Sequence, residues 1–238
     1  MGDGTKAVGE PLLRILHPSD FSRASRIAFA HALKIALLAK AELEIVHVQP
    51  HRIDSEKDVH WTEFPGVRST LARWKILPAD AKIEEVATTG LRIKKVLNAE
   101  SDPLEAKVRY CAEQPPDLLV LAVYQRDGIS RWLHKPVTEP LARRVRAMTL
   151  FVPSQCEGFI APANGAVKLR RILIPVDHEP DAQAALEEAY FLVTGLGCAE
   201  IEFRLLHSGF FDALRGNTTE RVLHSAHCPV LAVPAKSD

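Results

Sequence analysis

Histidine and cysteine are the side chains of this sequence with the widest chemical range, because they ligate metals and act as bases or nucleophiles. The 238 residues include ten histidines and four cysteines. The tightest cluster is His224, His227 and Cys228, just before the last predicted strand. Zinc there would need further ligands that the local sequence does not offer, so we expect no metal site.

A second group consists of basic side chains in one short segment, Arg126, Arg131, His134 and Lys135. Positive charges at this spacing attract an anion such as a phosphate group. A solvated basic loop without a ligand is the alternative, and the sequence favours it. The sequence has no GxxxxGK[ST] or GxGxxG loop and no GxSxG or HExxH motif. We therefore expect no catalytic centre.

The composition narrows the choice of partners. Lys and Arg together number 30, and so do Asp and Glu, which gives no net charge and a pI near 7.2. This balance excludes a broad basic surface of the kind that binds nucleic acid or an anionic membrane. No apolar run approaches the roughly 18 residues of a membrane span, and Met1–Glu10 lack the apolar stretch of a signal peptide. We expect a cytoplasmic protein with reduced thiols and neither nucleic acid nor membrane as partner.

An internal repeat organises the chain. The segment Arg14–Asp20 recurs as Arg171–Asp177, and Leu150–Pro153 recurs as Leu231–Pro234. The first pair of matching segments lies further apart in the sequence than the second pair. The second copy therefore lacks a segment from its middle.

Strands and helices alternate along the first copy, which predicts an α/β fold with a parallel sheet. The unbroken apolar run Leu118–Val123 is typical of a central strand buried on both faces. We expect Ser22 to cap the first helix and Asn164-Gly165 to turn a linker hairpin. The predicted strands lie near 13–18, 43–49, 91–98, 118–123 and 149–152, and the helices near 22–40, 66–76, 80–88, 103–113 and 136–146. The second copy keeps strands near 171–175, 201–206 and 229–233.

Five segments carry a resemblance to a known family: Ile15–Ser22, Ile45–Val48, Asp117–Ala122, Gly216–Leu223 and Cys228–Pro234. In this order they resemble the universal stress protein family, in its tandem form. The resemblance implies an open parallel five-stranded sheet flanked by helices, of the adenine-nucleotide α-hydrolase-like superfamily, with a truncated second copy. The expected parts are a flexible N-terminus (1–11), a first domain (12–153), a linker hairpin (154–169) and a truncated second domain (170–238).

The resemblance also implies a nucleotide site, because many members look like ATP or AMP binders. Their phosphates need a Gly-x-x-Gly turn after the fourth strand and a Gly-Ser pair at the next helix. Here the turn is Ala122-Val123-Tyr124-Gln125, and Lys135-Pro136 replaces the pair, so both turn glycines are lost. Proline also removes an N–H donor.

Eleven candidate nucleotide-binding residues follow from this comparison with the family. The first copy keeps the adenine and ribose positions but not the phosphate turn, and the second copy lacks two whole strands. Helix capping is the alternative role for Asp20 and for Gly216-Asn217. The candidates are Pro18, Ser19, Asp20, Val48, Ala122, Arg126, Lys135, Val137, Asp177, Gly216 and Asn217.

Neither copy carries a complete site, so we expect a non-catalytic binding or regulatory protein of the stress response, without a cofactor. The alternative is an ATP- or AMP-binding universal stress protein with weak ATPase activity. An enzyme of the wider superfamily is a further hypothesis, and no catalytic constellation supports it. We expect the second copy to dock on the first through Thr149–Val152 and Pro229–Val233. Exposed apolar surface then favours a homodimer, and an unknown protein partner is a further expectation.

Overall fold

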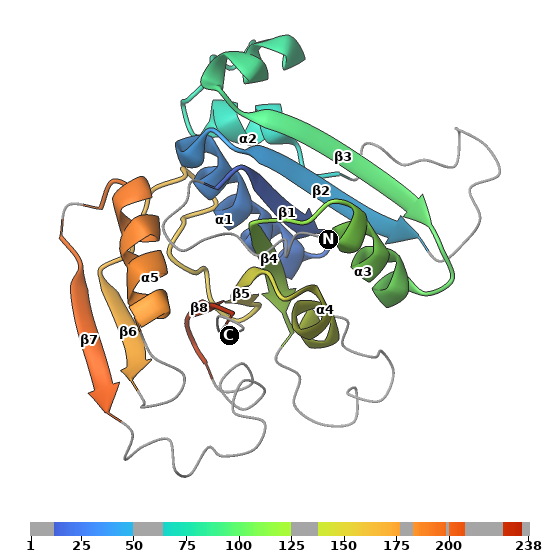
Figure 1. Ribbon diagram of the computed structural model, residues 1–238. Coiled ribbons are helices and arrows are strands. Elements are labelled where there is room, and N and C mark those ends of the chain that lie inside the picture. Colours follow the sequence, from blue (N-terminus) through green and yellow to red (C-terminus); the bar gives the residue numbers. More distant parts are fainter. Residues whose placement is uncertain are drawn as a thin grey trace.

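The fold consists of a large sheet with helices on both faces and a small second sheet beside it (Figure 1). The computed structural model describes residues 12–49, 64–124, 138–176, 183–198, 200–207 and 226–234. The strands are β1 (Arg14–Pro18), β2 (Glu42–Gln49), β3 (Arg92–Ala99), β4 (Leu118–Val123), β5 (Met148–Pro153), β6 (Arg171–Val176), β7 (Glu202–His207) and β8 (Val230–Ala232). The helices are α1 (Arg23–Ala39), α2 (Val67–Arg73), the 3-10 helix η3 (Ile83–Thr89), α3 (Pro103–Glu113), α4 (Thr138–Val145) and α5 (Gln183–Gly195).

The large sheet has the strand order β3-β2-β1-β4-β5-β8. Its first five strands pair in parallel, which confirms the expected five-stranded parallel sheet. The sixth strand, β8, pairs antiparallel with β5 at the edge of the sheet. Phe151 lies opposite Val230, so the expected docking of the two final strands on each other is confirmed.

Alternating side chains build a core on each face of this sheet. On β1, Ile15 belongs to the core on the α1 face, and its neighbour Leu16 belongs to the core that α3 and α4 cover. Successive residues of a strand point to opposite faces, which explains this division. Leu118, Leu119 and Val120 of β4 are all almost fully buried, as their unbroken apolar run predicts.

Polar side chains cap the starts of α1 and α3, and the cap of α1 is the one that the sequence predicts. The Ser22 side chain accepts a hydrogen bond from the backbone of Ser25 at the start of α1. Asp102 does the same for α3, which has Pro103 at its first position. The segment near 80–88 differs from the prediction, because it forms a 3-10 helix.

The small sheet has the same order of strand, helix and parallel strand as the beginning of the large one. β6 and β7 pair in parallel with α5 between them in sequence, as β1 and β2 do with α1. Each pairing starts with an arginine opposite a glutamate, Arg171 with Glu202 and Arg14 with Glu42. α5 contacts α1, so this unit lies against the α1 face of the large sheet.

The linker after β5 forms the hairpin that Asn164-Gly165 predicts, through an antiparallel bridge between Ile160 and Val167. Trp74 lies beneath it and donates a hydrogen bond from its ring nitrogen to the Pro162 carbonyl, at 3.1 Å. Trp74 thus packs under a loop. Among the described residues, every helix is too short or too polar to span a bilayer.

Candidate functional site

The carboxyl ends of β1, β2 and β4 meet at one edge of the large sheet, where open α/β sheets bind ligands. Immediately after β1, the Ser19 backbone nitrogen donates to the Val46 carbonyl at 2.8 Å. The Ser19 carbonyl in turn accepts a hydrogen bond from Nδ1 of His47, at 2.7 Å. These two contacts fix the expected adenine and ribose positions, Pro18 to Asp20 and Val48, beside each other.

The Asp20 carboxylate organises the turn into α1. Its Oδ1 accepts a hydrogen bond from the Ser22 backbone nitrogen at 3.0 Å. Ser22 caps the helix, so the alternative in which Asp20 caps it is wrong. Asp20 instead forms a local turn two residues earlier.

Tyr124, the residue after β4, covers the second oxygen of this carboxylate. Its hydroxyl donates to Oδ2 of Asp20 at 2.5 Å and also contacts the Ser22 hydroxyl. Partial desolvation favours the neutral acid, but hydrogen bonds from Ser22 and Tyr124 outweigh it and lower the pKa of Asp20. Lys107 of α3 adds a nearby positive charge, although burial lowers the pKa of its ammonium group. Both Asp20 oxygens are therefore engaged by the chain itself.

A buried polar chain lies behind this turn. His17 Nδ1 donates to the Val120 carbonyl at 2.9 Å, so its Nε2 accepts from the Ser25 hydroxyl at 3.2 Å. The hydroxyls of Ser19 and Ser25 lie 3.0 Å apart. Burial lowers the pKa of His17 to about 4, which keeps the ring neutral near pH 7. All three side chains are at most 2% exposed, so they hold the turn from behind, and at Ser19 only the backbone can meet a ligand.

An aromatic cluster stands on the β2 side of the site. The Phe21 ring stacks on His47, with centroids 4.0 Å apart, and meets Phe64 edge-on at 5.1 Å. Phe21 has a φ of 61°, a left-handed conformation that bulky residues rarely adopt. The stacking contacts hold this strained residue in place.

Val48 and Ala122 complete the part of the site that the structure describes. The Val48 side chain is buried in the core on the α3 and α4 face, so only its backbone can meet a ligand. The Ala122 carbonyl accepts a hydrogen bond from the Thr138 hydroxyl at 3.2 Å, which ties the start of α4 to the end of β4.

The structure thus brings together five of the predicted residues, Pro18, Ser19, Asp20, Val48 and Ala122. The other six lie outside the described residues: Arg126, Lys135, Val137, Asp177, Gly216 and Asn217. Sequence reasoning missed Tyr124 as a partner of Asp20. One signal could have revealed this role: Tyr124 lies inside the turn after β4, where the resemblance to the family predicts glycines. Within the described ranges, no group of three or more His, Cys, Asp or Glu side chains is placed to hold a metal ion.

Comparisons with known proteins bear on this architecture. A universal stress protein from Archaeoglobus fulgidus is 15% identical over 93% of this chain and 96% of its own, with a TM-score of 0.54. A protein of unknown function from Pseudomonas aeruginosa is 12% identical over 94% of this chain and 92% of its own, with a TM-score of 0.53. A universal stress protein in complex with cAMP is 21% identical, covers 61% of this chain and 99% of its own, and has a TM-score of 0.41. No curated protein matches the chain.

At these identities, the two structures with TM-scores above 0.5 show the fold alone. The sequence model of the universal stress protein family matches residues 12–153, which include all five parallel strands of the large sheet. That segment is more than half of the 238 residues. The chain therefore belongs to the universal stress protein family.

Proposed function

We propose that this protein acts in the stress response by binding or scaffolding and not by catalysis, with a nucleotide site that has degenerated. The observation that carries the proposal is the hydrogen bond from Tyr124 to Asp20, at 2.5 Å. Asp20 stands where ATP-binding members hold adenine and ribose. Its oxygens are already satisfied by Tyr124 and by the Ser22 backbone.

A ribose at this position would have to displace the Tyr124 hydroxyl. A hydrogen bond to a charged group contributes about 1.5–3 kcal/mol, so the displacement costs roughly tenfold or more in affinity. The turn after β4 also lacks both glycines that would let the backbone approach phosphates. The two effects act on different parts of the nucleotide and therefore add.

The second candidate function is that of an ATP- or AMP-binding protein with weak ATPase activity. One observation favours it, because Ser19, Asp20 and Val48 lie together at the carboxyl ends of β1 and β2. Lys107 also adds positive charge near Asp20. Nucleotide would then bind without the usual phosphate turn.

Titration calorimetry with Mg-ATP and with AMP distinguishes the two candidates. We expect no binding in the low micromolar range by the native protein and no release of phosphate from ATP. Tyr124→Phe removes only the hydroxyl and should raise nucleotide affinity by roughly tenfold or more. Tyr110→Phe is the matched control, because the Tyr110 hydroxyl donates to another carboxylate, Glu44, at 2.9 Å. Low-micromolar binding or ATP turnover by the native protein contradicts the proposal.

We further propose that residues 170–238 are a shortened second copy of the same domain. The β6-α5-β7 unit supports this, since it pairs in the same parallel register as β1-α1-β2. A cytoplasmic location and self-association to a homodimer belong to the same proposal.

A further inference from the structure

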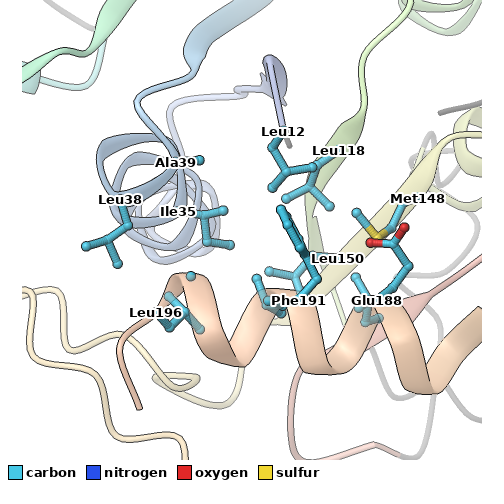
Figure 2. Close-up of a pocket in the computed structure, with 13 residues that line it drawn as sticks. Leu12, Ile35, Leu38, Ala39, Leu118, Met148, Leu150, Glu188, Phe191 and Leu196 are labelled. Atoms are coloured by element: carbon cyan, nitrogen blue, oxygen red, sulfur yellow. The ribbon is translucent and has the colours of Figure 1, made fainter. Parts of the chain in front are cut away.

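A cavity of about 240 Å³ lies between α1, α5 and the amino ends of β4 and β5 (Figure 2). Leu118, the first residue of β4, lines it on one side, and Phe191 of α5 points toward it from the other. The Asp20 turn lies at the carboxyl ends of the strands. The cavity is therefore a separate place in the fold, formed where α5 docks on the first domain.

The lining is almost wholly apolar. Leucines, isoleucine, methionine and phenylalanine supply most of it, with Met148 and Leu150 contributed by β5. An apolar cavity of about 150 Å³ stays dry and binds a molecule the size of benzene. The larger cavity here accommodates a longer apolar group, such as a medium-length alkyl chain.

One carboxylate stands in this apolar lining. Of the described residues that line the cavity, Glu188 alone has a polar side chain, and it is 5% exposed. Figure 2 shows its oxygens beside Met148, above α5. A buried carboxylate repels an anionic head group and favours a cationic one, because opposite charges attract strongly away from water.

We propose that the cavity binds a small cationic amphiphile, a primary alkylamine, with its chain against Leu118, Leu150 and Phe191 and its ammonium group at Glu188. Burial of the alkyl chain drives binding, and the carboxylate selects the head group. Because α5 and α1 form opposite walls, the ligand holds the second unit against the first. Binding therefore stabilises the whole chain against unfolding.

Calorimetry on the full chain with octylamine, octanol and octanoate tests the proposal. These probes share one chain length and differ in the charge of the head group. We expect octylamine to bind most tightly, octanol about tenfold more weakly, and octanoate weakest. Equal binding of octanoate and octylamine, or no binding of any of the three, overturns the proposal.

Two neighbouring carboxylates on α5 supply the matched pair of variants. Glu188→Gln should abolish the preference of octylamine over octanol while octanol still binds. Glu187→Gln should leave the preference intact, because Glu187 is exposed and pairs with Gln183 at 2.8 Å. Ala39→Leu adds volume to the α1 wall and should weaken all three probes, with circular dichroism confirming the fold. A preference that survives Glu188→Gln, or is lost equally in Glu187→Gln, contradicts the assignment.

Discussion

The Nε2 atom of His31, in α1, accepts a hydrogen bond from the backbone nitrogen of Phe159, in the linker after β5, at 3.0 Å. The same atom accepts a second hydrogen bond from the Ile160 nitrogen at 3.2 Å, and Nδ1 donates to the Ile27 carbonyl at 2.9 Å. The imidazole must be neutral to accept both bonds, because protonated Nε2 is a donor. His31 therefore fastens the linker to the first domain only while it is uncharged.

We expect the stability of the protein to fall as the pH decreases from about 6.5 toward 4. Burial lowers the pKa values of His17 and His31 from 6.5 to about 4 in the folded state. The unfolded chain then binds more protons in this window, so stability is full above pH 6.5 and is lost on acidification. Each histidine contributes on the order of 3 kcal/mol. Urea unfolding at successive pH values measures the loss.

His31→Gln is the control for this pH profile, because it removes one of the two titrating groups. The acid-induced loss of stability should shrink to roughly half of the native value. A native protein that is equally stable at pH 7 and pH 4.5 contradicts the prediction.

The glycine at position 158 should resist substitution by alanine. Gly158 has a φ of 71°, and an added Cβ would overlap the His31 ring. Gly197 is the matched control, because its φ is 65° and an added Cβ there meets nothing within 4 Å. We expect Gly158→Ala to destabilise by roughly 3 kcal/mol and Gly197→Ala by about 1 kcal/mol, measured by thermal unfolding. Equal losses would show that the linker does not pack on His31.

Local signals explain why much of the fold was predictable. The apolar run Leu118–Val123, the cap at Ser22 and the Asn164-Gly165 turn each specify structure within a few residues. The candidate site was predictable only where a strand end positions it, as at Asp20.

The missed features depend on contacts between distant segments. Tyr124 reaches Asp20 across 104 residues, and no local pattern encodes that hydrogen bond. His31 looks like an ordinary residue of an amphipathic helix until the linker lies beside it. The left-handed backbone conformation of Phe21 is stabilised by stacking on His47, which lies in β2, distant in the sequence.

The antiparallel pairing of β5 with β8 should bring two cysteines within cross-linking reach. Continuing the register by two residues beyond Phe151 and Val230 places Pro153 opposite Cys228. The Cys156 thiol lies 3.4 Å from the Pro153 carbonyl. We expect mild oxidation of the dilute protein by glutathione disulfide to join Cys156 to Cys228, with two of the four thiols lost and reduced glutathione released.

Peptide mapping after oxidation identifies the cross-linked pair. Burial, and more weakly the neighbouring Cys228, raise the pKa of Cys156, so the reaction should accelerate with increasing pH. Cys228→Ser should prevent the cross-link. Cys111→Ser is the control and should not change it, because Cys111 is buried and burial raises its pKa to about 12. A different cross-linked pair in the map would contradict the position of Cys228 beside Cys156.

The β6-β7 sheet should mediate self-association of two chains. Each of its strands has one neighbour among the described residues, and isolated two-stranded sheets are marginally stable in water. Phe203 and Leu205 of β7 lie on one face of this sheet, and they are 38% and 50% exposed although both are large and apolar. A second copy of the chain covers such a surface economically, because one patch then serves both partners.

Light scattering on a size-exclusion column measures the assembly. We expect a mass of twice 26.3 kDa at micromolar concentration. Phe203→Asp and Leu205→Asp should shift the protein toward the monomer, since each places a charge in the apolar contact. Ile83→Asp is the matched control, because Ile83 is 71% exposed in η3, outside the β6-β7 sheet. A native mass near 26.3 kDa, or dissociation by Ile83→Asp alone, argues against this interface.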